Sequence, residues 1–102
     1  MKRTNNSQVI ASWANGLSAT NHKNSLVAMK DGTLYSYSLK IGQRTPSGVC
    51  ILADYTSPGG AYRSQTTSCH VGLARQVADM VMHPYVWETS PLSNDPYTEI
   101  PF

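Results

Sequence analysis

The sequence predicts a single α+β domain over residues 1–102, with an antiparallel β-meander of about four strands covered by a C-terminal helix. The length suits one domain, because domains most often have roughly 100–150 residues. Residues 33–41 alternate between apolar and polar side chains, which is typical of a half-buried strand. Residues 73–81 repeat apolar side chains at the spacing of one helical face. We therefore expect this helix to cover the sheet that precedes it.

A first helix is predicted over residues 6–16. Either Asn6 or Ser7 can cap it, because each side chain accepts a hydrogen bond from a free backbone N–H at a helix start. Asn15-Gly16 is expected to end it, since both residues tolerate the left-handed conformation. Its expected apolar face consists of Val9, Ile10, Trp13, Ala14 and Leu17.

The antiparallel sheet is predicted over residues 25–65, with strands at 26–30, 33–41, 49–56 and 62–65. Asp31-Gly32 indicates a hairpin turn, and two segments with Pro in second position, 45–48 and 57–60, indicate further turns. Within residues 33–41 we expect one face toward the core and one toward solvent. The core face would carry Tyr35, Tyr37, Leu39 and Ile41, and the solvent face Ser36, Ser38 and Lys40.

The second helix is predicted over residues 67–82, starting near Thr66, Thr67 or Ser68. It should end before His83, because a residue that precedes proline is disfavoured in helical geometry. Residues 83–102 hold four of the six prolines, which predicts an extended Pro-rich tail rather than a helix or a central strand. We expect Tyr85 and Trp87 in this tail to pack on the domain.

Charge and cysteine content restrict the class of protein. Residues 1–82 carry eight basic and three acidic side chains, a net charge of +5, and residues 83–102 carry −3. The tail could dock on its own domain, or the basic body could bind an anionic partner. Cys50 and Cys69 form no disulfide framework and are expected as free thiols in a reducing cytoplasm. No apolar run approaches the ~20 residues of a membrane span and no signal-type segment follows the first residues, so we expect a soluble intracellular protein without a membrane partner.

The candidate binding residues cluster where the second helix is predicted to begin. They are Arg63, Ser64, Thr66, Thr67, Ser68 and His70. A helix N-terminus attracts anions, so hydroxyl groups and an imidazole there could hold a phosphate. The same composition is typical of a helix cap, and His70 shares its helical register with Leu73 and Val77, so the structural interpretation is preferred. Tyr97 and Phe102, which lie among acidic residues of the tail, are a second candidate interface.

Other site chemistries are less well supported. The spacing of Cys50, Cys69, His70 and His83 matches no zinc signature, so we expect no metal and no cofactor. Tyr35 and Tyr37, with basic residues nearby, could form a platform for stacking bases, so a nucleic-acid-binding module remains an alternative function. A hydrolase-type enzyme using His70 is the least favoured alternative, because no acidic partner is fixed in the sequence. No catalytic residue is therefore predicted.

Two segments resemble a family of small tailed-bacteriophage proteins of unknown function. The first is Ser36-Tyr37 followed by Lys40-Ile41-Gly42, which resembles the Ser-Tyr-x-x-x-Ile-Ala strand of that family. The second, Ser64–His70, matches its Ser-x-Thr-Thr-Ser-x-His segment, which opens a helix. The resemblance covers roughly residues 34–78, and Gly42 stands where the family usually has Ala.

The resemblance implies a phage origin and a location in the host cytoplasm. Small accessory phage proteins often bind and block a host machine, including CRISPR effectors. The function that the resemblance implies is therefore non-enzymatic binding and inhibition of a host protein or ribonucleoprotein complex, with an anti-CRISPR as the most concrete version.

Overall fold

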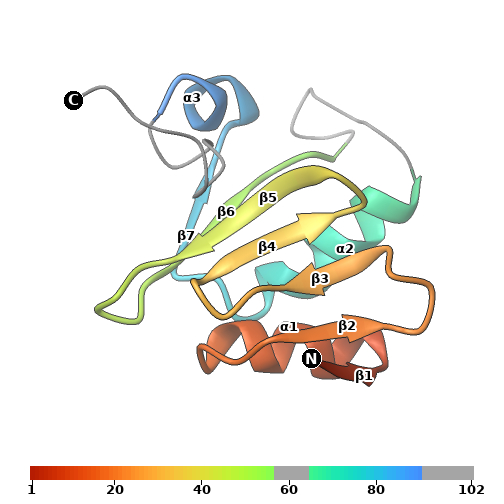
Figure 1. The fold of residues 1–102 in the computed structure, drawn as a ribbon. Helices are drawn as coiled ribbons and strands as arrows, with labels where there is room; N and C mark the ends of the chain where they lie inside the picture. Colours follow the sequence, from red (N-terminus) through yellow and green to blue (C-terminus); the bar gives the residue numbers. More distant parts are fainter. Residues whose placement is uncertain (57–64, 91–102) are drawn as a thin grey trace.

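The computed structural model describes residues 1–56 and 65–90, which form a seven-stranded mixed sheet and three helices (Figure 1). The strands follow one another across the sheet in chain order. They are β1 (Lys2–Thr4), β2 (Ala19–Asn21), β3 (Leu26–Ala28), β4 (Thr33–Ser36), β5 (Leu39–Arg44), β6 (Cys50–Ala53) and β7 (Met80–Met82). The helices are α1 (Asn6–Ala14), α2 (Gln65–Arg75) and α3 (Pro84–Glu88).

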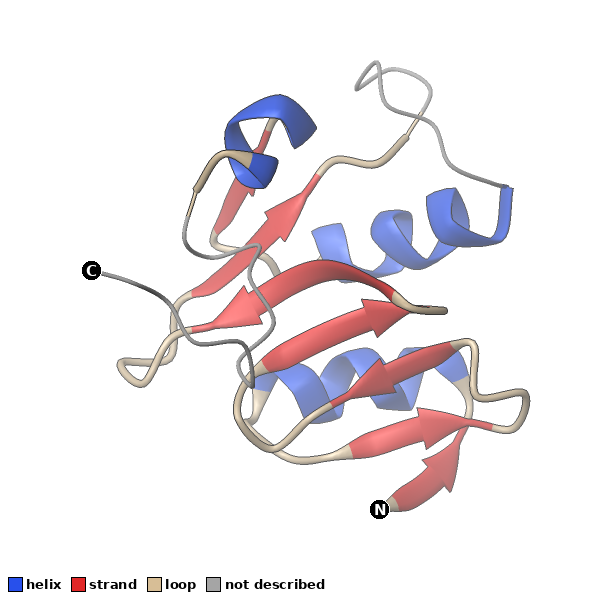
Figure 2. Ribbon diagram, turned by 45° about the horizontal axis from the view of Figure 1, so that its top comes forward, coloured by secondary structure: helices blue, strands red, loops and turns tan. Residues whose placement is uncertain are grey.

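The sheet is an antiparallel meander with one parallel strand added at each side. Strands β2 to β6 pair antiparallel, whereas β1 pairs parallel with β2 and β7 pairs parallel with β6. Parallel neighbours need a crossover connection, and here α1 and α2 lie within the two crossovers. Both helices lie on one face of the sheet and contact each other (Figure 2). The two helices therefore cover that face of the sheet together.

The predicted four-stranded meander covered by a C-terminal helix is wrong, although the chain is α+β as expected. The antiparallel part has five strands, and the prediction missed β1, β2 and β7. Each of these three strands has only three residues, which is too short for a period of two to be recognised. The predicted fourth strand, 62–65, lies outside the described residues except for Gln65, which begins α2.

The second helix ends at Arg75 rather than at Met82, and residues 80–82 form β7. Asp79 explains the change of direction, because it is tied to β6 through both its backbone and its side chain. Its backbone N–H donates to the Cys50 carbonyl at 2.8 Å, and its Oδ2 accepts from the Cys50 N–H at 2.9 Å. A short helix, α3, then replaces the start of the predicted extended tail, with Pro84 in its first turn.

Helix α1 begins at Asn6 as predicted, but Asn5 is the cap, since its side chain accepts from the Gln8 N–H at 2.9 Å. The buried face of α1 contains Trp13, whose Nε1 donates to the Gly32 carbonyl at 2.8 Å. A Cβ at Gly42 would lie 2.8 Å from the Trp13 ring. The indole therefore occupies the space that a side chain at position 42 would need.

The predicted strand 33–41 is broken into β4 and β5 by a turn at Tyr37, which has a φ of 55° and is exposed. A register shift beside Tyr35 also interrupts the alternation. As a result Ser36 is fully buried toward α2, and Tyr35 pairs with Lys40 on the other face. The predicted faces are therefore wrong for Ser36, Tyr37 and Lys40. Ile41 is buried and Ser38 is exposed, as expected. The turn at 45–48 is confirmed by the Gly48 N–H, which donates to the Thr45 carbonyl at 2.9 Å.

Candidate functional site

The predicted binding segment lies on α2, and its inward side is fastened to the sheet. Ser36 Oγ of β4 lies 2.9 Å from Thr67 Oγ1 and 2.7 Å from His70 Nδ1. All three side chains are buried, with His70 only 1% exposed. Burial lowers the pKa of His70, so its ring is neutral at pH 7. This cluster holds α2 against the sheet, and its serine is sealed from any substrate.

His70 also lines a polar hollow of about 500 Å³ between the N-terminal ends of α1 and α2. The loop between β2 and β3 forms its third side. The residues that line this polar hollow are Thr4, Asn5, Asn6, Ser7, Asn21, His22, Lys23, Ser25, Thr66 and His70. None of these ten residues is acidic, and Lys23 supplies a positive charge. The polar hollow is thus suited to an anion rather than a cation.

Asn21 sets the shape of the β2–β3 side of the polar hollow. Its Nδ2 donates to Asn6 Oδ1 at 2.9 Å and to Ser25 Oγ at 2.8 Å. Its Oδ1 accepts from the Ser25 backbone N–H at 2.8 Å. A single buried amide therefore joins the start of α1 to the loop that carries Lys23, and the two sides keep a fixed spacing.

The structure brings together only part of the predicted site. Thr66 and His70 line the polar hollow, whereas Thr67 points to Ser36, and Ser68 is half-buried and does not line it. Arg63, Ser64, Tyr97 and Phe102 lie outside the described residues. Sequence reasoning missed the contribution of α1 and of the β2–β3 loop. The sequence predicts Asn6 and Ser7 only as candidate caps of the first helix, and nothing in it places them beside Thr66.

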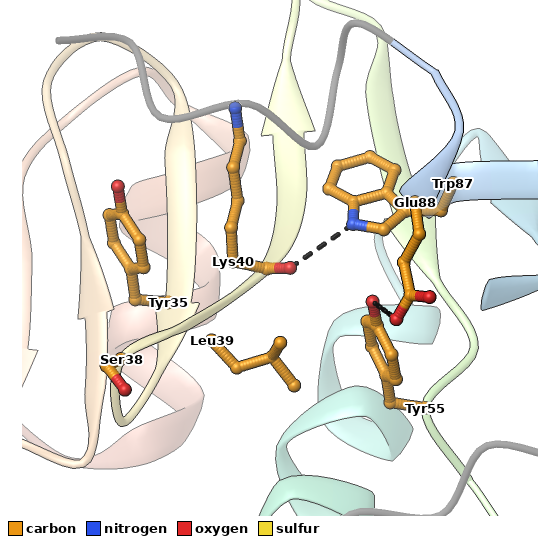
Figure 3. Close-up of a pocket in the computed structure, with 7 residues that line it drawn as sticks. All are labelled: Tyr35, Ser38, Leu39, Lys40, Tyr55, Trp87 and Glu88. Atoms are coloured by element: carbon orange, nitrogen blue, oxygen red, sulfur yellow. Dashed lines mark hydrogen bonds between the residues drawn. The ribbon is translucent and has the colours of Figure 1, made fainter. Parts of the chain in front are cut away.

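A second concavity, the α3 groove, lies between β5 and α3 on the other side of the sheet (Figure 3). It measures about 310 Å³ and is lined by Tyr35, Ser38, Leu39, Lys40, Tyr55, Trp87 and Glu88. Trp87 is buried, as expected, and its Nε1 donates to the Lys40 carbonyl at 3.3 Å. The Tyr55 hydroxyl donates to Glu88 Oε1 at 2.8 Å. These two bonds fix α3 to the sheet.

The stacking platform predicted from the two tyrosines does not form as a single surface. Tyr35 lines the α3 groove beside Lys40, and the two side chains extend in the same direction (Figure 3). Tyr37 instead lies in the β4–β5 turn, where its ring is 6.4 Å from that of His70. Two bases could not stack on both rings side by side.

Several large apolar side chains are exposed on β7 and α3. Met80, Val81, Tyr85 and Val86 are 51%, 42%, 72% and 50% exposed, respectively, and we refer to these four side chains as the apolar edge. The expectation that Tyr85 packs on the domain is wrong. Four large apolar side chains exposed within seven residues are unusual for a surface, since exposed apolar residues are normally scattered singly.

Cys50 and Cys69 are both free thiols, one buried and one exposed. Burial raises the pKa of the Cys50 thiol, Asp79 raises it further, and Arg44 opposes both. In the described part of the chain, no group of three or more His, Cys, Asp or Glu side chains is placed to hold a metal ion. Within residues 1–56 and 65–90, no helix is long and apolar enough to cross a bilayer.

Comparison with known proteins adds no assignment: no protein-family model, no curated protein and no solved structure matches this chain. The resemblance to the phage family therefore stays a prediction from the two sequence segments.

Proposed function

We propose that this protein works by binding a protein partner along the apolar edge, without catalysing a reaction. The observation that carries the proposal is the concentration of exposed Met80, Val81, Tyr85 and Val86 on a strand at the side of the sheet and on the helix that follows it. Exposed apolar patches of this kind mark surfaces that bind other proteins, because their burial removes apolar area from water.

The backbone of β7 supports an extended partner segment. The Met82 carbonyl accepts from the Asp54 N–H at 3.0 Å, so residue 82 directs its backbone groups toward β6. In a parallel pair successive residues alternate in direction, so the N–H and C=O of Val81 point away from β6. No described strand pairs with that side of β7. A partner strand can add there, with its side chains reaching the apolar edge.

The identity of the partner is proposed from the resemblance to the phage family. It implies a host protein or ribonucleoprotein complex whose activity is blocked when this protein binds, and an anti-CRISPR is the most concrete version. A binding role is also supported by the burial of Ser36, the hydroxyl bonded to His70, because a nucleophile sealed from solvent cannot reach a substrate.

The test is affinity capture from a bacterial host lysate with matched variants. Val81→Pro removes the outward N–H and spares the bonds of β7 to β6, and proline is tolerated where a strand N–H faces solvent. Tyr85→Lys places a charge in the apolar edge. Leu17→Lys is the control, because Leu17 is an apolar side chain that is 59% exposed and lies just after α1, outside the apolar edge.

We expect the wild-type and Leu17→Lys proteins to retain the same captured protein, and Val81→Pro and Tyr85→Lys to lose it. Circular dichroism confirms that each variant is folded before capture. Equal capture by all four proteins would show that the partner binds elsewhere.

A further inference from the structure

Helices α1 and α2 begin side by side at the polar hollow. Asn6 and Ser7 are the first two residues of α1, and Thr66 is the second residue of α2. The N–H groups at these positions have no acceptor within their own helix. Each helix also places the positive end of its dipole there. The N-terminal ends of two helices, which are nine and eleven residues long, therefore meet at the polar hollow.

His70 supplies an independent indication of a ligand. The residue is 1% exposed, and its Nδ1 is bonded to Ser36. Its other ring nitrogen, Nε2, has no hydrogen-bond partner among the described residues. In the described part of the chain, every fully buried side-chain nitrogen has a hydrogen-bond partner. Nε2 has none, so it is not fully buried in the core. Because the ring lines the polar hollow, Nε2 opens into it.

We propose that the polar hollow binds a phosphate monoester, with the phosphoryl oxygens accepting from the helix N–H groups and from His70 Nε2. In this assignment Ser36 Oγ donates to Nδ1, which leaves the hydrogen of the neutral ring on Nε2 as a donor. Lys23 adds a positive charge at the rim, and none of the ten described residues that line the polar hollow is acidic. A volume of about 500 Å³ leaves room for the organic part of the ester beyond the phosphate.

The proposal goes beyond the protein-binding role, because it uses other elements. The apolar edge lies on β7 and α3, whereas the polar hollow is formed by α1, α2 and the β2–β3 loop. A negative result for one of the two proposals therefore leaves the other proposal standing.

The experiment is a titration followed by ¹⁵N–¹H NMR at low salt, with inorganic phosphate, phosphoserine and a nucleoside monophosphate as separate probes. We expect saturable shifts at the amides of Asn6, Ser7 and Thr66. The probe that binds most tightly tells whether the organic part is an amino acid, a nucleoside or neither. The shifts should weaken as salt is added, because the attraction is electrostatic.

Three variants sharpen the test. Lys23→Ala should weaken binding about threefold to tenfold, whereas Lys30→Ala, which removes an exposed lysine remote from the polar hollow, should leave it unchanged. His70→Asn places an amide oxygen near the position of Nδ1 and removes Nε2, so it should weaken binding about tenfold or more while the protein stays folded.

Absence of saturable shifts at these three amides with every probe would overturn the proposal. So would equal weakening by Lys23→Ala and Lys30→Ala, because that result indicates a general charge effect. The Lys23 comparison keeps the test decisive even if His70→Asn does not fold.

Discussion

Ser36→Ala tests the role of the buried cluster between β4 and α2. The substitution removes a hydroxyl bonded to His70 Nδ1 at 2.7 Å and to Thr67 Oγ1 at 2.9 Å. A typical hydrogen bond contributes about 1 kcal/mol net, and a buried group left without its partner costs about 1–3 kcal/mol. His70 Nδ1 is left without its partner in a fully buried position, so we expect Ser36→Ala to lower the free energy of unfolding by about 2–3 kcal/mol. For a domain of this size that corresponds to a fall in Tm of roughly 10–20 °C.

Thermal and urea denaturation followed by circular dichroism measure this loss. The control is Ser38→Ala, the same substitution two residues away at an exposed position in the β4–β5 turn, which should change stability by less than about 0.5 kcal/mol. A Ser36→Ala protein with the same Tm as the Ser38→Ala protein would refute the reasoning. It would mean that the cluster does not fasten α2 to the sheet.

Three further predictions concern buried positions. Because the pKa of His70 is lowered in the folded protein, the unfolded chain binds a proton more readily than the folded one. The contribution of His70 to stability is therefore fully present above about pH 6.5 and is lost as the pH falls below it. Urea midpoints measured at about pH 7.5 and about pH 5.5 should show a smaller decline for His70→Asn than for the wild type. A thiol reagent should modify Cys69 in the native protein and reach Cys50 only after unfolding, because Cys50 is buried with a raised pKa; native labelling that persists in Cys69→Ala would contradict this. Gly42→Ala forces a Cβ to within 2.8 Å of the Trp13 ring and should cost about 1–3 kcal/mol in a thermal melt; a melt equal to that of the wild type would contradict this.

Local chemistry predicted the parts of the fold that depend on single turns and caps. The first helix starts at Asn6 and stops before Asn15-Gly16, with Gly16 at a φ of 75°. The turns at 31–32 and 45–48 also lie where their glycines require them, since Gly32 and Gly48 have φ values of 97° and 93°. These features are encoded within a few residues, so one sequence suffices to find them.

The rest of the fold depends on contacts between distant segments. β1 and β7 are three-residue strands whose pairing is decided by β2 and β6, and neither carries a period of its own. The apolar run through residue 82 predicts a helix, because Met80 and Val81 fit both the helical and the strand period. Asp79, which bonds to Cys50 across the sheet, decides between them.

The candidate site shows the same limit. The composition of Thr66–His70 indicated a helix start that could hold an anion, and Thr66 and His70 do line the polar hollow. The other half of the hollow comes from Asn6, Ser7 and the loop carrying Lys23, roughly fifty residues earlier in the chain. Only the crossover that sets α1 beside α2 brings the two halves together.

The most direct test of the protein-binding proposal is hydrogen exchange at the Val81 amide, measured in the free protein and in its complex with the captured partner. Val81 directs its N–H away from β6, so it should exchange quickly in the free protein and become strongly protected in the complex. The Met82 amide, which faces β6, should already be protected in the free protein and serves as the internal control. A complex in which Val81 exchanges as quickly as in the free protein, with new protection elsewhere, would contradict binding along the apolar edge.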